Sequence, residues 1–295
     1  MVLNKLHGII VPLSTPIKED QSIDFPATKN LVDKLIENGV DGLFPLSGTG
    51  EFPMLSLRES KQFINFVMRS SSGRVPVYPG AFRDNLGDTL ELAFAAEISG
   101  AEGIVLMPPY FYGRIKSEDI VDQVRRIKCN INLPVIFYNT NSKLRLDEAS
   151  MLRLHQEGLV IGAKEGSKDL DYLKRLAESG MSVLPGSDKL LYAASQFGCV
   201  GGFPGSANVL TKGFVTLWKF IQEEKLQEAE ALQSRISSVV EVMYKTNPYS
   251  AQTGVKIGLE YLGICLSRMK YPMPQATTEE KRIIFETLDK NKDLL

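Results

Sequence analysis

Two short segments of the sequence place a phenol and an amine directly after apolar runs. Tyr138 follows the run 134–137, and Lys164 follows the run 159–161 after two small residues. A helix-like stretch comes after each segment, which is typical of consecutive parallel strands that are covered on both faces. We therefore expect Tyr138 and Lys164 at the C-terminal ends of two neighbouring strands, where a phenol and an amine can act together.

Lys164 is a candidate for imine chemistry. A free lysine has a pKa of about 10.4, so only about one amine in a few thousand is neutral at pH 7. The closed top of a barrel disfavours the charged form, and a neutral amine can attack a ketone to give a protonated imine, an electron sink. Tyr138 could relay protons to and from this adduct. The alternatives are a Lys164–Glu165 ion pair and a core tyrosine whose hydroxyl bonds to the backbone.

Two glycine-containing segments also follow apolar runs. Residues 47–51 read Ser-Gly-Thr-Gly-Glu, and their backbone N–H groups, with the Thr49 hydroxyl, could hold a substrate carboxylate. Residues 201–206 precede a helix, at a position where barrels often bind phosphate. A phosphorylated substrate and a tight packing turn are therefore both open readings of the second segment.

One unit recurs along the chain: an amphipathic helix, a glycine and an apolar strand. Glycine is the usual residue just past a helix because it adopts positive φ without a Cβ clash. Apolar runs predict eight strands, at residues 8–12, 41–47, 75–80, 102–108, 134–139, 159–164, 181–186 and 199–204. Eight alternating units in about 220 residues favour an α/β fold of the (β/α)8 TIM barrel type over a doubly wound sheet.

After residue 224 the pattern changes to helices alone. Helices are expected at about 226–245, 254–268 and 277–290, with a break at Asn247-Pro248. We predict a catalytic barrel of residues 1–224 and a C-terminal helical extension, residues 225–295, that packs on the barrel.

Composition excludes several classes of function. The 295 residues carry a formal net charge of −1, so no basic field favours nucleic acid or an anionic membrane. Three widely spaced cysteines and two isolated histidines disfavour disulfides and a metal site. No apolar run is long enough to span a bilayer, and the first residues lack a signal peptide's pattern. We expect a soluble, cytoplasmic protein with no cofactor, no metal, no nucleic-acid partner and no membrane association.

Together the motifs resemble those of the dihydrodipicolinate synthase / N-acetylneuraminate lyase family of pyruvate-dependent class I aldolases. The family pattern is G-[ST]-T-G-E, then Y-N, then G-x-K-[ED]. The corresponding segments of this chain are residues 47–51, 138–139 and 162–165, in the same order and spacing, with a departure from the first pattern at Gly48. Asn247-Pro248 also resembles the NP motif of the family's helical tail.

The resemblance implies roles for the site residues. Lys164 would be the Schiff-base lysine, Tyr138 the proton-relay tyrosine, and Thr49 with the backbone of Gly48 would hold the pyruvyl carboxylate. Further substrate contacts are expected from Gly186, Asp188 and Ser206. The resemblance also implies a homotetramer that acts on a small-molecule 2-keto acid and an aldehyde.

Departures from the family pattern bear on the substrate. Dihydrodipicolinate synthases have a threonine where this chain has Gly48, and a tyrosine that reaches across a subunit interface where it has Phe111. Tyr110 or Tyr112 could substitute for that tyrosine. The synthases also carry an arginine where this chain has Lys143, which cannot make the same bidentate grip on a carboxylate.

Other departures favour sugar acids. Residues 186–188 look like those of archaeal-type 2-keto-3-deoxygluconate aldolases, and Lys189 stands where sialic acid lyases have a glutamate. Residues 48–52 also resemble the sugar-acid dehydratase branch. The leading hypothesis is a class I lyase acting on a 2-keto-3-deoxy sugar acid. The alternatives are 4-hydroxy-tetrahydrodipicolinate synthase, a sugar-acid dehydratase and a non-enzymatic sugar-acid-binding barrel.

Overall fold

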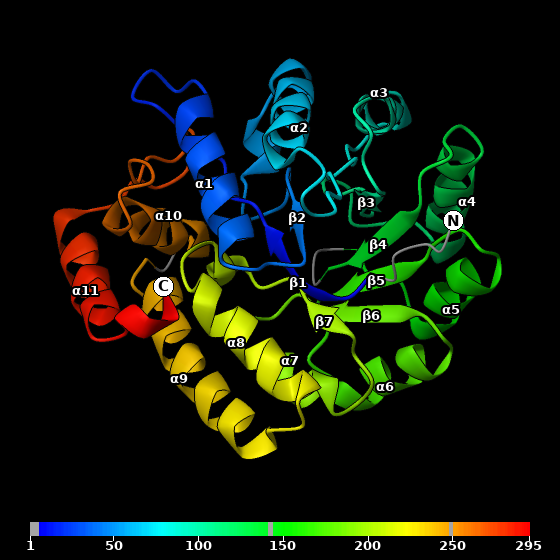
Figure 1. The fold of residues 1–295 in the computed structure, drawn as a ribbon. Coiled ribbons are helices and arrows are strands. Elements are labelled where there is room, and N and C mark those ends of the chain that lie inside the picture. Colours follow the sequence, from blue (N-terminus) through cyan, green and yellow to red (C-terminus); the bar gives the residue numbers. More distant parts are fainter. Residues whose placement is uncertain (1–5, 141–143, 248–249) are drawn as a thin grey trace.

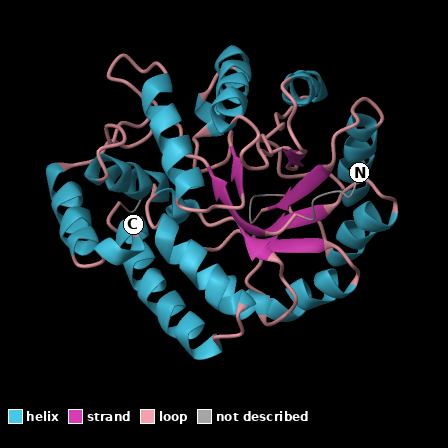
Figure 2. Ribbon diagram, in the orientation of Figure 1, coloured by secondary structure: helices cyan, strands magenta, loops and turns pink. Residues whose placement is uncertain are grey.

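A computed structural model describes residues 6–140, 144–247 and 250–295. Helices surround a central set of parallel strands (Figure 1, Figure 2). The strands are β1 (Gly8–Pro12), β2 (Gly42–Phe44), β3 (Ile104–Leu106), β4 (Val135–Asn139), β5 (Gly162–Glu165), β6 (Ser182–Pro185) and β7 (Gly201–Gly202). Every strand residue is buried except Tyr138 and Ser182, which are half-buried. Burial on both faces explains why the strands read as continuous apolar runs.

The strands pair in chain order to form the barrel wall. One sheet has the order β2-β1-β7 and the other β3-β4-β5-β6, and all named pairs are parallel. Backbone bonds join the two sheets on one side, where the N–H of Val200 donates to Val183 O (3.1 Å) and that of Phe203 to Pro185 O (2.9 Å). These bonds close the wall between β6 and β7.

On the other side, residues 75–80 stand between β2 and β3. They were predicted as a regular strand, and the structure corrects this to two isolated bridges, Leu43 with Val77 and Gly80 with Val105. The reason is that Pro76 and Pro79 have no N–H to donate to a ladder. Their carbonyl oxygens still accept bonds from the neighbouring strands, at 3.0 Å and 2.9 Å. The segment therefore takes the place of the eighth strand in the barrel wall.

Helices cover the wall and continue beyond it. They are α1 (Phe25–Glu37), α2 (Leu57–Ser71), α3 (Leu86–Ile98), α4 (Ser117–Lys128), α5 (Glu148–Gln156), α6 (Leu170–Glu178), α7 (Leu191–Ser195), α8 (Thr211–Gln222), α9 (Leu226–Lys245), α10 (Ala251–Tyr261) and α11 (Thr278–Asp289). Short 3-10 helices are η1 (Phe52–Met54), η2 (Gly205–Asn208) and η3 (Lys292–Leu294). The glycines that end five of the βα units, at 39, 100, 158, 180 and 198, all have positive φ, between +67° and +88°.

The C-terminal helices α9, α10 and α11 pack on one another and, through α8, on the barrel (Figure 1). Helix α10 begins at Ala251 and ends at Tyr261, earlier than the predicted residue 268. It stops there because Gly263, at φ +69°, turns the chain out of the helix. Pro248 and Lys143, singled out from the sequence, lie outside the described residues.

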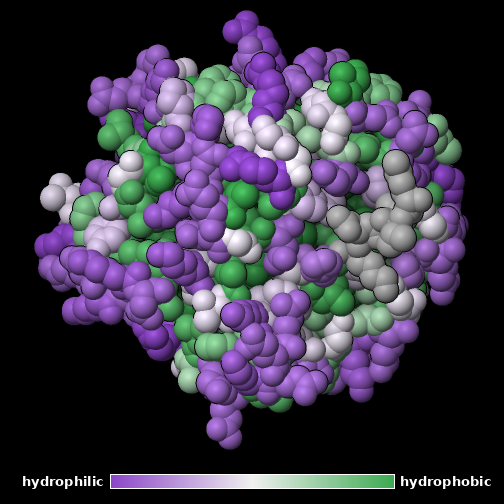
Figure 3. All heavy atoms as spheres, viewed as in Figure 1, coloured by the Kyte–Doolittle hydropathy of each residue, from purple (hydrophilic) through white to green (hydrophobic). Residues whose placement is uncertain are grey.

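The surface of the molecule is mixed. Hydrophilic residues cover most of the face seen in Figure 3, and hydrophobic residues show between them toward the centre of the view. Among the described helices, none combines the length and the hydropathy that a bilayer crossing requires.

Candidate active site

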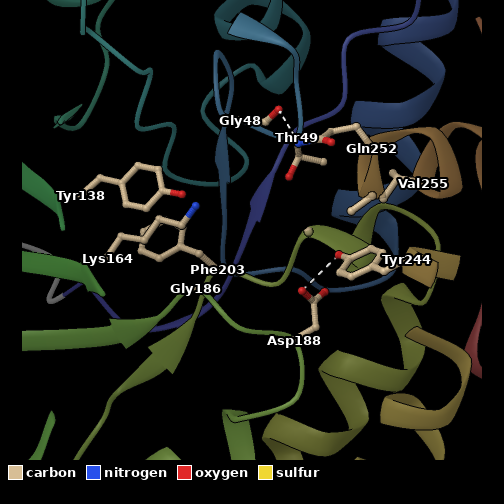
Figure 4. Close-up of a pocket in the computed structure, with 12 residues that line it drawn as sticks. Gly48, Thr49, Tyr138, Lys164, Gly186, Asp188, Phe203, Tyr244, Gln252 and Val255 are labelled. Atoms are coloured by element: carbon tan, nitrogen blue, oxygen red, sulfur yellow. Dashed lines mark hydrogen bonds between the residues drawn. The ribbon is translucent and has the colours of Figure 1, made fainter. Parts of the chain in front are cut away.

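Tyr138 and Lys164 lie side by side at the barrel's C-terminal end. They are direct partners in the register of β4 and β5, which confirms the predicted adjacency. Lys164 is only 5% exposed. Its Nζ lies 4.0 Å from the centre of the Tyr138 ring, 5.1 Å from that of Phe44 and 5.6 Å from that of Phe203. The amine is therefore enclosed by aromatic rings and, as Figure 4 shows, its tip faces the same space as the Tyr138 hydroxyl.

Glu165 points away from this space because successive strand residues alternate between the two faces. Its carboxylate accepts bonds from Asn139 Nδ2 and the Tyr172 hydroxyl, both at 3.0 Å, and pairs with Arg145 at 3.2 Å. Burial raises the pKa of Glu165. The ion pair between Lys164 and Glu165, an alternative left open by the sequence, is therefore absent, and no other described carboxylate forms an ion pair with Lys164.

The electrostatics of the pair favour proton transfer at Tyr138. The positive charge of Lys164 lowers the pKa of the Tyr138 phenol from its usual value of 10.0, against the opposing effect of burial. A phenol with a lowered pKa gives up its proton more readily and takes it back in a later step. That is the requirement for a group that serves first as general acid and then as general base.

The loop 47–51 follows β2 and faces the same space. Leu46, just before the loop, and Glu51, its last residue, have positive φ of +59° and +58°, and the backbone turns sharply at both. Within the described chain, the N–H groups of Gly48 and Thr49 donate to no protein atom. Two neighbouring unpaired N–H groups beside a threonine hydroxyl form a site suited to a carboxylate.

A buried ion pair holds this loop from behind. Glu51 Oε1 lies 3.1 Å from Nζ of Lys256 on α10, and both side chains are almost fully buried. Glu51 Oε2 also accepts the N–H of Lys270 at 2.9 Å. The helical extension thus supports the loop that presents the open N–H groups.

A cluster centred on Asp188 lies across the space from Lys164. The N–H of Ser206 donates to Asp188 Oδ1 at 2.7 Å, and the Ser206 hydroxyl donates to the same oxygen. The Tyr244 hydroxyl, from α9, donates to Oδ2 at 3.1 Å (Figure 4). Burial raises the pKa of Asp188, while the hydrogen bonds from Ser206 oppose that shift.

These groups enclose one cavity of about 200 Å³. Its lining contains six of the seven predicted site residues, Gly48, Thr49, Tyr138, Lys164, Gly186 and Asp188. Ser206 is fully buried behind the lining and contacts Asp188 instead. Gly186 makes room for the lysine, because a Cβ at that position would come within 3.3 Å of Lys164 Cε.

Sequence reasoning missed four lining residues from the helical extension: Tyr244, Ala251, Gln252 and Val255. Phe203 and Gly205 also line the cavity and fall within the predicted segment 201–206. Tyr244 and Gln252 flank the Asn247-Pro248 motif, and that motif was the one available signal that this region approaches the site. Gln252 Nε2 donates to Gly48 O at 3.5 Å. Among the described residues, no group of three or more His, Cys, Asp or Glu side chains is placed to hold a metal ion.

The three aromatic residues after β3 lie elsewhere. Phe111 and Tyr112 are 68% and 66% exposed and pack edge to face at 5.1 Å. Tyr110 packs on Phe52 at 5.4 Å. None of the three is part of the cavity lining in this chain. Lys189 is also outside the lining and pairs with Glu241 on the surface.

Comparison with known proteins points to one family. The family model of the Dihydrodipicolinate synthetase family matches residues 5–291. A DapA-like lyase of Halobacterium salinarum is 30% identical over 272 residues, 91% of this chain and 88% of its own length. The 4-hydroxy-tetrahydrodipicolinate synthase 1 of Halalkalibacterium halodurans is 28% identical, with 93% of each chain covered.

Solved structures show the same architecture. YagE, a prophage protein of the dihydrodipicolinic acid synthase family from E. coli K12 solved in complex with pyruvate, superimposes with a TM-score of 0.92. It is 27% identical, and the match covers 98% of this chain and 99% of YagE. The fold is therefore a TIM barrel with C-terminal helices. The chain belongs to the dihydrodipicolinate synthetase family and is a lyase of that family.

Proposed function

We propose that Lys164 forms an imine with a 2-keto acid and that the enzyme cleaves or forms the carbon–carbon bond between pyruvate and an aldehyde, with a 2-keto-3-deoxy sugar acid as substrate. One observation carries the proposal. The Lys164 amine, held among three aromatic rings and without a carboxylate partner in the described chain, faces the Tyr138 hydroxyl and a cavity. The unpaired N–H groups of Gly48 and Thr49 would hold the substrate carboxylate.

In the cleavage direction the steps balance without an added reactant other than water. The neutral amine of Lys164 attacks the C2 ketone, and the Tyr138 phenol donates the proton with which the carbinolamine hydroxyl leaves as water, giving the protonated imine and a tyrosinate. Tyr138 takes the proton of the C4 hydroxyl, and the C3–C4 electron pair moves toward the imine nitrogen. An aldehyde leaves, and an enamine of pyruvate remains. Tyr138 gives the C4 proton to C3, and hydrolysis by one water releases pyruvate, restores the amine and returns a proton to Tyr138.

Reduction with borohydride in the presence of pyruvate tests the imine. We expect one covalent adduct per chain, located on Lys164 by peptide mass spectrometry. If the adduct falls on Lys256 or another lysine, or if none forms, the proposed mechanism is wrong.

A second candidate is 4-hydroxy-tetrahydrodipicolinate synthase, which condenses pyruvate with aspartate semialdehyde. It is favoured by the names of relatives such as that of Halalkalibacterium halodurans. The absence of a hydroxyl at Gly48 and Phe111 speaks against it. A coupled assay with the semialdehyde, run beside 2-keto-3-deoxy acids, separates the two; turnover with the semialdehyde alone would reverse the order. The dehydratase alternative predicts loss of water from a sugar acid without release of pyruvate.

The expected assembly is a homotetramer, as the resemblance to this family implies. The exposed pair Phe111 and Tyr112 supports association, because two adjacent aromatic side chains are costly to leave in water. Sedimentation velocity measures the assembly directly, and we expect the double variant Phe111→Ser, Tyr112→Ser to shift it toward smaller species.

A further inference from the structure

The turn after β7 already binds a carboxylate of the protein itself. Barrels often bind phosphate through backbone N–H groups at this place. Here the N–H and the hydroxyl of Ser206 both donate to the carboxylate of Asp188. The Asp188 side chain is 6% exposed, and Gln233 Nε2 holds its backbone carbonyl at 3.1 Å. The two donors of Ser206 at this turn are therefore occupied by a carboxylate and are not open to a substrate phosphate.

Tyr244 completes this end of the cavity. Its ring comes from α9, and its hydroxyl proton is used in the bond to Asp188 Oδ2. The phenol oxygen keeps lone pairs that can accept a hydrogen bond. Gly205 leaves space for it, because a Cβ there would lie 3.0 Å from both the Tyr244 hydroxyl and the Thr49 hydroxyl. The groups that this cluster offers to a ligand are thus acceptors, and the natural partner of an acceptor is a substrate hydroxyl.

The charges of the lining point the same way. Among the described lining residues, Lys164 is the one cation and Asp188 the one carboxylate. In the proposed reaction Lys164 bonds to the substrate ketone. The N–H groups of Gly48 and Thr49 are suited to the carboxylate next to that ketone. A second anionic group would meet Asp188 in a buried place where the described lining has no cation other than Lys164 to balance it, which is strongly unfavourable.

We propose that Asp188 and Tyr244 make the cavity selective for substrates with an uncharged, hydroxyl-bearing tail and exclude phosphorylated ones, with Tyr244 as a specificity-determining residue. The inference rests on the proposed function, since it concerns the aldehyde half of the same reaction. It decides between the two readings of residues 201–206 that the sequence leaves open.

The test compares two aldehydes in condensation with pyruvate: glyceraldehyde and glyceraldehyde 3-phosphate. We expect the wild-type enzyme to favour glyceraldehyde in kcat/KM by about tenfold or more, the effect of one charged hydrogen-bonding group. Asp188→Asn should reduce this preference, because the repelling charge is gone. Tyr244→Phe keeps the ring and should lower kcat/KM for glyceraldehyde about tenfold, mostly through KM.

Tyr261→Phe is the matched control. The Tyr261 hydroxyl also donates to an aspartate, Asp289, at 2.7 Å, but on the surface of the same helical extension. We expect this variant to keep the wild-type kcat/KM for both aldehydes. Melting temperatures of the variants separate altered specificity from altered folding.

Borohydride trapping with pyruvate, done first, separates the two proposals. Absence of the Lys164 adduct would contradict the proposed function. If the adduct forms, any one of three results would overturn the inference. They are equal kcat/KM for the two aldehydes, no turnover of glyceraldehyde, and a Tyr244→Phe variant with the same kcat/KM values as Tyr261→Phe.

Discussion

Two lysines among the described residues are buried, and their surroundings differ in kind. Lys256 is fully buried on α10, where its Nζ contacts the Glu51 carboxylate at 3.1 Å, the Thr15 carbonyl oxygen and the Arg268 carbonyl oxygen at 3.0 Å. Lys164 is 5% exposed at the end of β5, among aromatic rings, with a cavity before it and no described carboxylate paired with it.

The comparison shows that burial alone does not prepare an amine for chemistry. At Lys256 two backbone carbonyl oxygens accept hydrogen bonds from the amine, and the Glu51 carboxylate lies within ion-pair distance, so the side chain serves as a support. Lys164 instead has three ring faces around it and the Tyr138 hydroxyl as an oxygen partner, and no described carboxylate pairs with it. Because no described carboxylate pairs with it, Lys164 can react with a ligand in the cavity. Lys256 is held in place by its oxygen partners.

The largest expected effect is on chemistry at Lys164. We expect Lys164→Met to abolish the borohydride-trapped pyruvate adduct and all turnover, because the nucleophile is lost. Its free energy of unfolding should change by only about 1 kcal/mol, since no ion pair is broken and the volume is kept. Intact mass and urea denaturation measure the two quantities, and an adduct on the variant would contradict the contrast between the lysines.

The same change at Lys256 should act on stability instead. Lys256→Met leaves the buried Glu51 carboxylate without its cation, and we expect a loss of about 3–5 kcal/mol in the free energy of unfolding. Folded Lys256→Met should still form the pyruvate adduct. Adding Glu51→Gln should recover part of the loss because the buried charge is removed. Equal stability of Lys256→Met and wild type in urea denaturation would show that the pair is not a support.

A smaller effect is expected at Tyr138. Tyr138→Phe keeps the ring beside Lys164 and removes the phenol, so the imine should still form but about a hundredfold more slowly, the low end of acid–base contributions. Time-resolved trapping with pyruvate and borohydride measures this rate. Tyr78→Phe, a buried change outside the cavity lining, is the control. A Tyr138→Phe variant as fast as this control would remove Tyr138 from the mechanism.

The smallest effect is a shift in the titration of Tyr138. The charge of Lys164 lowers the pKa of this phenol, whereas burial raises it. In Lys164→Met the lowering cause is gone and burial remains, so the pKa of Tyr138 should rise relative to wild type. Tyrosinate absorbance is measured between neutral and alkaline pH in wild type and in Lys164→Met. Subtracting the curve of the same protein with Tyr138→Phe added leaves the titration of Tyr138 alone. Identical titration curves would mean that the Lys164 amine carries no charge beside the phenol.

Several features could be predicted from particular residues of the sequence. Tyr138 and Lys164 each follow an apolar run, and the pairing of β4 with β5 brings them together as expected. Asp169 caps the N-terminus of α6, a role typical of aspartate, since its side chain accepts the N–H of Tyr172. Residues 75–80 show the limit of such patterns: they have the right hydropathy, but two prolines prevent a regular ladder.

By itself, the sequence determined which chemical groups stand at the ends of parallel strands, because strand periodicity and the order of βα units are local properties of the chain. Only the tertiary structure decided that Glu165 faces away from Lys164, that Asp188 occupies the anion position beside Ser206, and that Tyr244 closes the cavity. Those contacts join residues far apart in the chain, and their geometry depends on how the C-terminal helices pack on the barrel, which no local pattern encodes.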